Sequence, residues 1–230
     1  NAAFILYAPM PYVLETCLHE VYTDRGWDLT TGLNHRVAED QWNNASKWPL
    51  FPTLSDLYYK IDEVTERLGY EERIEMDVKA GLKARIGSLR LGSKGLMLDT
   101  DHGVPMAELL SVPTVLELER IGNDDEKAFL IGLVMTRLYE YRRVQSMQSV
   151  TPAFQHLLVI EEAHRLLKNV STEVETESAN TKGQAVETFA NMLAEIRAYG
   201  QGVLIAEQVP TKLAPDAVKN VGALADGLGQ

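Results

Sequence analysis

The chain has 230 residues, enough to bury a substantial core in one large domain or in one and a half small ones. Its content of 45% apolar and 24% charged residues is ordinary for a globular protein. The formal net charge of -11 excludes a protein whose whole surface binds nucleic acid or anionic lipid, and leaves only a local basic patch open.

Residues 1–98 carry apolar side chains at helical spacing, which predicts a mostly helical subdomain. One helix is expected over residues 12–22, and a second follows Ser55, whose hydroxyl suits the N-cap position. The segment between them is rich in Gly, Asn, Thr and Pro and predicts a long loop. A third helix is expected over residues 71–91.

The charges in and just after this third helix are polarised. Acidic residues at its start are followed by the basic residues Lys79, Lys83, Arg85, Arg90 and Lys94. Acid at the start and base at the end suits the helix dipole. The alternative interpretation is a phosphate-facing patch that contacts DNA, and charge alone does not decide between the two.

Residues 99–230 predict a second domain in which strands and helices alternate. Such alternation is typical of parallel strands with helices on both faces of the sheet. The apolar runs also lack an inside–outside alternation, as expected for strands that are covered on both faces. Residues 170–184 are polar and predict a mobile loop, and Gly200 suits the end of the preceding helix. The expected strands are "TVLELE" at 114–119, "HLLVI" at 156–160 and "GVLIAEQ" at 202–208, with helices starting at 123 or 124 and near 186.

Polar side chains stand at the ends of these strands: Glu119, Glu161, Glu162, Glu207 and Gln208. Ligands of open parallel sheets bind at the carboxyl ends of the strands, and a buried carboxylate there needs a partner. Four apolar residues followed by Glu161 and Glu162 match the Walker B arrangement, in which the first acid helps to hold Mg²⁺ and the second orients the attacking water. A strand that leads into a helix N-terminus also favours acids because of the helix dipole, so a purely structural role for the two glutamates stays open.

Two further residues are compatible with phosphate chemistry. Gln208 would lie at the end of a strand near Glu162, where an amide can hydrogen-bond both water and a phosphate oxygen. Arg197 could carry positive charge toward phosphates of its own subunit or of a neighbour, or it could be a solvated helix residue.

Three motifs in order carry a family resemblance: "LELERIGNDDEKAFLIGLVMTRLYEYRR", "LLVIEEAHRLL" and "AEIRAYGQGVLIAEQVPTKLAPDAVKN". They resemble the ATP-binding domain of the HerA group, within the HerA and FtsK superfamily of hexameric DNA-pumping ATPases. The resemblance implies an α/β fold with a RecA-like P-loop NTPase core at 99–230, its parallel sheet flanked by helices, and a mostly helical subdomain at 1–98. It also implies a homohexamer that binds ATP and Mg²⁺ between subunits, with Glu161 on the metal side, Glu162 as catalytic glutamate, Gln208 as a sensor-like residue and Arg197 as a phosphate-sensing arginine.

The chain departs from that pattern in three places. The family usually has Asp where this sequence has Glu161. No GxxxxGK[ST] motif occurs, so we expect the first part of the ATPase to be absent and residues 1–230 alone not to bind ATP tightly. After Asn220, where the family continues into another strand, the sequence is the small, Gly-rich "VGALADGLGQ".

The preferred hypothesis is an ATP-hydrolysing translocase or helicase of the HerA type, which moves double-stranded DNA and works with a nuclease or an antiphage effector. The first alternative is a ring-forming, ATP-binding scaffold that organises an effector enzyme without translocation, and a weaker one is a pump in secretion or conjugation.

The remaining features concern the compartment and other kinds of site. The apolar stretches are too short to cross a bilayer, so no integral membrane segment is expected. The single cysteine, Cys17, suits a buried apolar position in a protein of the reducing cytoplasm. Zinc ligation by His164 and Glu161 is disfavoured, because no second histidine or cysteine lies nearby.

Overall fold

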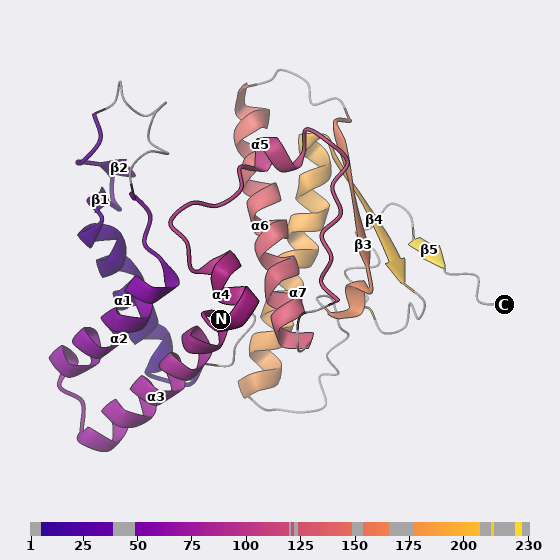
Figure 1. Cartoon of the computed structure of the whole chain (residues 1–230). Helices are drawn as coiled ribbons and strands as arrows, with labels where there is room; N and C mark the ends of the chain where they lie inside the picture. Colours follow the sequence, from indigo (N-terminus) through magenta and orange to yellow (C-terminus); the bar gives the residue numbers. More distant parts are fainter. Residues whose placement is uncertain are drawn as a thin grey trace. The chain divides into compact units, whose positions relative to one another are not determined.

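The computed structural model describes residues 6–38, 49–119, 121, 124–148, 154–165, 177–207, 213 and 224–226 (Figure 1). Within these residues the fold is mixed α/β with two small sheets, one of them parallel. The chain divides into two units, Leu6–Val104 and the part from Pro105 onward, so the break falls a few residues beyond the boundary expected at 98. Among the described residues, no helix combines the length and apolar character needed to cross a membrane.

The first unit is mostly helical. An antiparallel pair of two-residue strands, β1 (Trp27–Asp28) and β2 (Leu33–Asn34), lies in the segment predicted as a long loop. Its core joins three helices through buried side chains that include Cys17, Ile61 and Leu82, so the predicted burial of Cys17 is confirmed. Its helices are α1 (Met10–Asp24), α2 (Leu54–Leu68), α3 (Glu72–Leu89) and α4 (Gly92–Leu98).

Helix α2 begins two residues earlier than a cap at Ser55 would place it. Thr53 is the N-cap: its hydroxyl accepts from Asp56 N at 3.1 Å, and the Asp56 carboxylate accepts from Thr53 N at 2.8 Å. This reciprocal pair is a capping box. The prediction that Ser55 caps the helix is therefore wrong, and its backbone N–H instead donates to Asp99 Oδ1 at 2.7 Å.

The second unit holds a three-stranded parallel sheet in the order β3-β4-β5, formed by β3 (His156–Glu161), β4 (Gln201–Glu207) and β5 (Leu224–Asp226). The strands expected at 156–160 and 202–208 are thus confirmed as parallel neighbours. The sheet also gains β5 within the Gly-rich ending, which the sequence did not predict. The helices are α5 (Met106–Leu109), α6 (Asp124–Gln148) and α7 (Glu177–Ile196).

Helices α6 and α7 lie side by side against the sheet (Figure 1). Their contact with it buries a core that includes Met135, Ile160, Leu193 and Ile205. On the other face of β3, Leu157 and Val159 remain 48% and 50% exposed. The prediction that both faces of β3 are covered is therefore wrong for the described part of the chain.

Two other expectations of the sequence reading are also corrected. Residues 114–119 form no strand, and Val115 is 85% exposed, because a β-propensity pattern becomes a strand only where another strand supplies hydrogen bonds. Part of the expected loop at 170–184 is helical, since α7 already begins at Glu177, and residues 170–176 lie outside the described part. The predicted stop at Gly200 is confirmed: it adopts a left-handed φ of 78° after the 3₁₀ turn Arg197–Tyr199.

Candidate functional site

The carboxyl ends of the parallel strands form what we call the carboxyl edge of the sheet, and their amino ends form the amino edge. The carboxyl edge carries the acid pair that the sequence singles out. Glu161 is the last residue of β3 and is in register with Ala206 of β4. The next residue, Glu162, extends the ladder by donating its N–H to the Ala206 carbonyl at 3.1 Å. Both glutamates are exposed to solvent. The structure therefore places both glutamates at the carboxyl end of β3, where α/β proteins bind ligands.

Glu162 has a strained backbone. Its φ is +52°, and it is the one non-glycine residue with positive φ in the described ranges. A residue with a Cβ loses roughly 1–2 kcal/mol in the left-handed region, because Cβ approaches the following carbonyl oxygen. Strain of this kind concentrates at functional sites, where the surrounding structure holds the residue in place.

A third carboxylate at this edge, Glu207, has a partner that the sequence did not reveal. Glu207 is the last residue of β4 and only 5% exposed. Its Oε2 lies 2.6 Å from His164 Nδ1 and accepts a hydrogen bond from His164 N at 3.2 Å. His164 lies in the 3₁₀ turn Ala163–Arg165 directly after the acid pair. The sequence does show that Glu207 ends an apolar run, which predicts its place at a strand end. It does not show that His164 is its partner, because that contact depends on β3 and β4 being neighbours.

The expectation that a carboxylate at a strand end is buried and needs a partner holds for only one of these acids. A buried carboxylate at a strand end does need a partner, but this applies to Glu207, which finds His164. It does not apply to Glu161 and Glu162, because both are exposed. The reason is that β3 and its following turn lie at the outer side of the described sheet, where water reaches them.

Arg197 lies at the opposite edge of the sheet. It occupies the 3₁₀ turn just before β4, whereas Glu161 is in register with Ala206 near the end of that strand. At roughly 3.3 Å per residue, the length of the strand separates the two edges by about 16 Å. The structure thus does not bring the exposed Arg197 to the acids of its own chain, and its predicted role toward phosphates stays a prediction. Gln208, the other predicted site residue, lies outside the described residues.

The amino edge near Arg197 also contains a buried arginine. Arg142 is 4% exposed, and its guanidinium donates to the side chains of Gln201 at 3.1 Å and Gln155 at 2.6 Å. No carboxylate contacts it within the described parts of the chain. Burial lowers the pKa of the Arg142 guanidinium, and burial together with the Arg142 charge lowers the pKa of nearby His156. His156 is therefore neutral at pH 7 and contacts Gln201 through Nδ1 at 3.0 Å.

The residues at the acid edge fit magnesium only in part. No group of three or more His, Cys, Asp or Glu side chains that could hold a metal ion occurs among the residues described. Mg²⁺ does not need such a group, because it commonly binds one or two carboxylates together with phosphates and water. Glu161 can supply one such carboxylate. The Nδ1 atom of His164 is held by Glu207 at 2.6 Å.

Two of the basic candidates, Lys79 and Lys83, are paired with acids of the same unit. Lys79 pairs with Glu66 at 3.2 Å and Glu75 at 3.4 Å, and Lys83 pairs with Asp62. These contacts join α3 to α2, so the polarised charge pattern reflects helix packing as well as the helix dipole. With these partners, the two lysines offer little net positive charge to a DNA phosphate.

The other three basic candidates have different surroundings. Arg90 Nε lies 3.6 Å from Asp99 Oδ2 and donates to Ser55 Oγ at 3.1 Å. Arg85 donates to the Gly81 carbonyl one turn earlier at 2.7 Å. Lys94 is half-buried in α4. The prediction that these side chains contact DNA phosphates stays a prediction.

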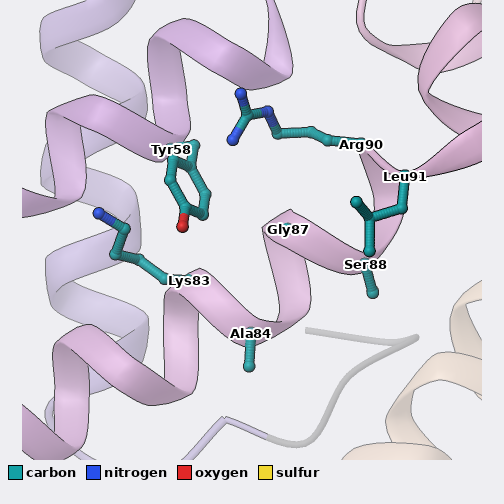
Figure 2. A pocket seen from close by; sticks show the side chains of 7 residues that line it. All are labelled: Tyr58, Lys83, Ala84, Gly87, Ser88, Arg90 and Leu91. Carbon is teal, nitrogen blue, oxygen red and sulfur yellow. The ribbon is translucent and has the colours of Figure 1, made fainter.

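A pocket of about 440 Å³ lies between α2 and α3 of the helical unit. Figure 2 shows Tyr58 between Lys83 and Arg90, and Lys83 Nζ and Arg90 Cζ each lie 4.3 Å from the centre of its ring. These cation–π contacts stabilise the two helices against each other. Because Asp62 and Asp99 balance the two cations, the pocket has no marked preference for an anion. Ala84, Gly87, Ser88 and Leu91 complete its lining.

No family model, curated protein or solved structure matches the chain. The candidate site thus comprises the strained backbone of Glu162 beside Glu161, the buried Glu207–His164 contact and the exposed Arg197 before β4.

Proposed function

We propose that the chain is the Walker B part of an ATP-hydrolysing motor of the HerA type, with a RecA-like core. The observation that carries the proposal is the backbone of Glu162. Glu162, which the Walker B interpretation makes catalytic, is the non-glycine residue held at positive φ in the described ranges. It directly follows the carboxyl end of the parallel strand β3.

Two carboxylates with different tasks would act at this edge. Glu161 holds Mg²⁺, directly or through water, and the metal supplies charge neutralisation for the phosphates of ATP. Glu162 orients and activates the attacking water. Gln208 is proposed as the polar sensor beside them. Because the 230 residues contain no GxxxxGK[ST] motif, the phosphate cradle has to come from other residues of the complete protein.

The opposite placement of acids and arginine supports a ring. Glu161 and Glu162 lie at the carboxyl edge of the sheet and Arg197 at the amino edge, and all three are exposed. A head-to-tail contact would bring Arg197 of one subunit toward the acids of the next, and such contacts close into rings when the rotation allows. Exposure of the acids in the single chain is then expected, because a neighbouring subunit completes the site. We propose a homohexamer of this kind.

Within this proposal the ring moves double-stranded DNA and works in the cytoplasm with a nuclease or a defence effector. The buried thiol of Cys17 is compatible with that compartment. One observation favours the alternative of a scaffold that binds ATP without translocation: Lys79, Lys83 and Arg90 are paired with acids of the same unit, which reduces their net attraction for DNA phosphates.

The experiment that tests the proposal uses the full-length protein with ATP, Mg²⁺ and duplex DNA that carries a bound protein roadblock. A motor hydrolyses ATP faster with DNA present and displaces the roadblock in one direction. Ring assembly and ATP binding without displacement would support the scaffold. Absence of both nucleotide binding and hydrolysis would refute the two readings together.

A further inference from the structure

The turn that presents Glu162 is anchored on the neighbouring strand β4. Glu162 is exposed, and the following Ala163 is completely buried. One residue further on, His164 makes two contacts with the Glu207 carboxylate. The strained residue is therefore followed at once by two positions that fix the chain.

Both contacts of His164 go to the same oxygen, Glu207 Oε2. The backbone N–H donates at 3.2 Å and the ring Nδ1 lies at 2.6 Å. A carboxylate that accepts the free N–H of a 3₁₀ turn acts as a side-chain cap, and the ring contact adds a second donor. With Nδ1 as the donor, the same contact also selects the ring tautomer.

Glu207 is itself poorly able to move. Its side chain is only 3% exposed, and it ends β4, whose backbone pairs with β3 through Glu161. A buried carboxylate that loses its donors would be left unsatisfied, so the pair is maintained from both sides. The contact joins the ends of two neighbouring strands at the edge where the acid pair stands.

We propose that Glu207 and His164 are positioning residues, which hold the turn so that the Glu162 carboxylate keeps one direction at the sheet edge. This rests on the proposed ATPase function. Neither residue is assigned a contact with substrate. The arrangement corresponds to the outer groups that orient reacting side chains in other sites, where removing such a group lowers activity by about 10- to 100-fold.

The test compares His164→Leu with His164→Asn in the full-length protein. Leucine removes the ring donor, whereas the asparagine amide nitrogen stands close to the place of Nδ1 and can donate to Glu207. His164→Leu is expected to lower kcat for ATP by at least about tenfold while KM changes by less than about twofold. His164→Asn is expected to recover most of kcat. His19→Leu, at an exposed position in the helical unit, is the matched control and should leave kcat unchanged.

Amide hydrogen exchange over residues 161–165 of the same variants separates positioning from mere stability. His164→Leu should speed exchange in this segment, and His164→Asn should restore it. Unchanged exchange in His164→Leu would show that the contact does not hold the turn. Faster exchange with an unchanged kcat would show that the turn does not position Glu162; either result overturns the inference while wild-type turnover keeps the ATPase proposal. Absence of wild-type ATP turnover would overturn both.

Discussion

The strained backbone at Glu162 predicts an unusual order of stability for two variants. At φ +52°, Glu162→Ala keeps a Cβ in the left-handed region, whereas Glu162→Gly does not. Both variants lose the glutamate side chain, so its contacts cancel in the comparison. The difference between the two therefore reports the backbone alone.

The expected magnitude follows from two opposing terms. Removing Cβ from the left-handed region gains roughly 1–2 kcal/mol. Glycine also lowers the free energy of unfolding by about 0.5–1 kcal/mol, because it has more conformational freedom in the unfolded chain. Glu162→Gly should therefore be more stable than Glu162→Ala, by about 0.5–1 kcal/mol.

Glu140 provides the matched control, since it is an exposed position inside α6 of the same unit. There the order should reverse, with Glu140→Gly about 1 kcal/mol less stable than Glu140→Ala. Guanidinium-induced unfolding measures all four variants through the midpoint at an unchanged slope. If alanine proves more stable than glycine at position 162 as well, the backbone there is not strained, and the argument from strain to function fails.

Three further predictions concern the helical unit. Thr53→Ala should lower the free energy of unfolding by about 1 kcal/mol through loss of the capping box, while Thr53→Ser should retain it, as measured by denaturant titration. Burial raises the pKa of the Cys17 thiol to about 12, so a thiol reagent at pH 8 should label it only as fast as the unit opens; rapid labelling of the folded protein would contradict this. Burial alone would raise the pKa of Asp99, but hydrogen bonds from Ser55 and the Arg90 charge outweigh it and hold that pKa below its usual value. The Asp99 contribution to stability is thus present above about pH 4 and is lost as pH falls through the lower folded-state pKa, so Asp99→Asn should flatten the decrease in stability below pH 4.

The elements that could be predicted from the sequence are those whose signal is local. The apolar stripes of α1, α2 and α3 and the apolar runs of β3 and β4 each show their type within a short window. The segment at 114–119 has the same kind of pattern but forms no strand, since pairing depends on a partner elsewhere in the chain. The three-residue strand β5 is too short to leave a pattern.

The candidate site likewise has features that are local in the sequence and features that depend on distant residues. The adjacency of Glu161 and Glu162 is local, and their position after an apolar run predicted the sheet edge that they occupy. The Glu207–His164 contact joins residues 43 positions apart, and it follows from the register of β3 and β4 rather than from any spacing in the sequence. Arg197 was predicted to direct its charge toward phosphates, and the sequence did not reveal that it precedes β4 and so lies at the amino edge.

The central claim is that Glu162 acts on the water that cleaves ATP, and one substitution in the full-length protein tests it most directly. Glu162→Gln keeps the shape of the side chain and the backbone strain but removes the base. We predict that hydrolysis falls by at least about 100-fold while the Kd for ATP changes by less than about threefold, and that Glu187→Gln, at an exposed glutamate of α7, changes neither. Hydrolysis by Glu162→Gln at the wild-type rate would contradict the account.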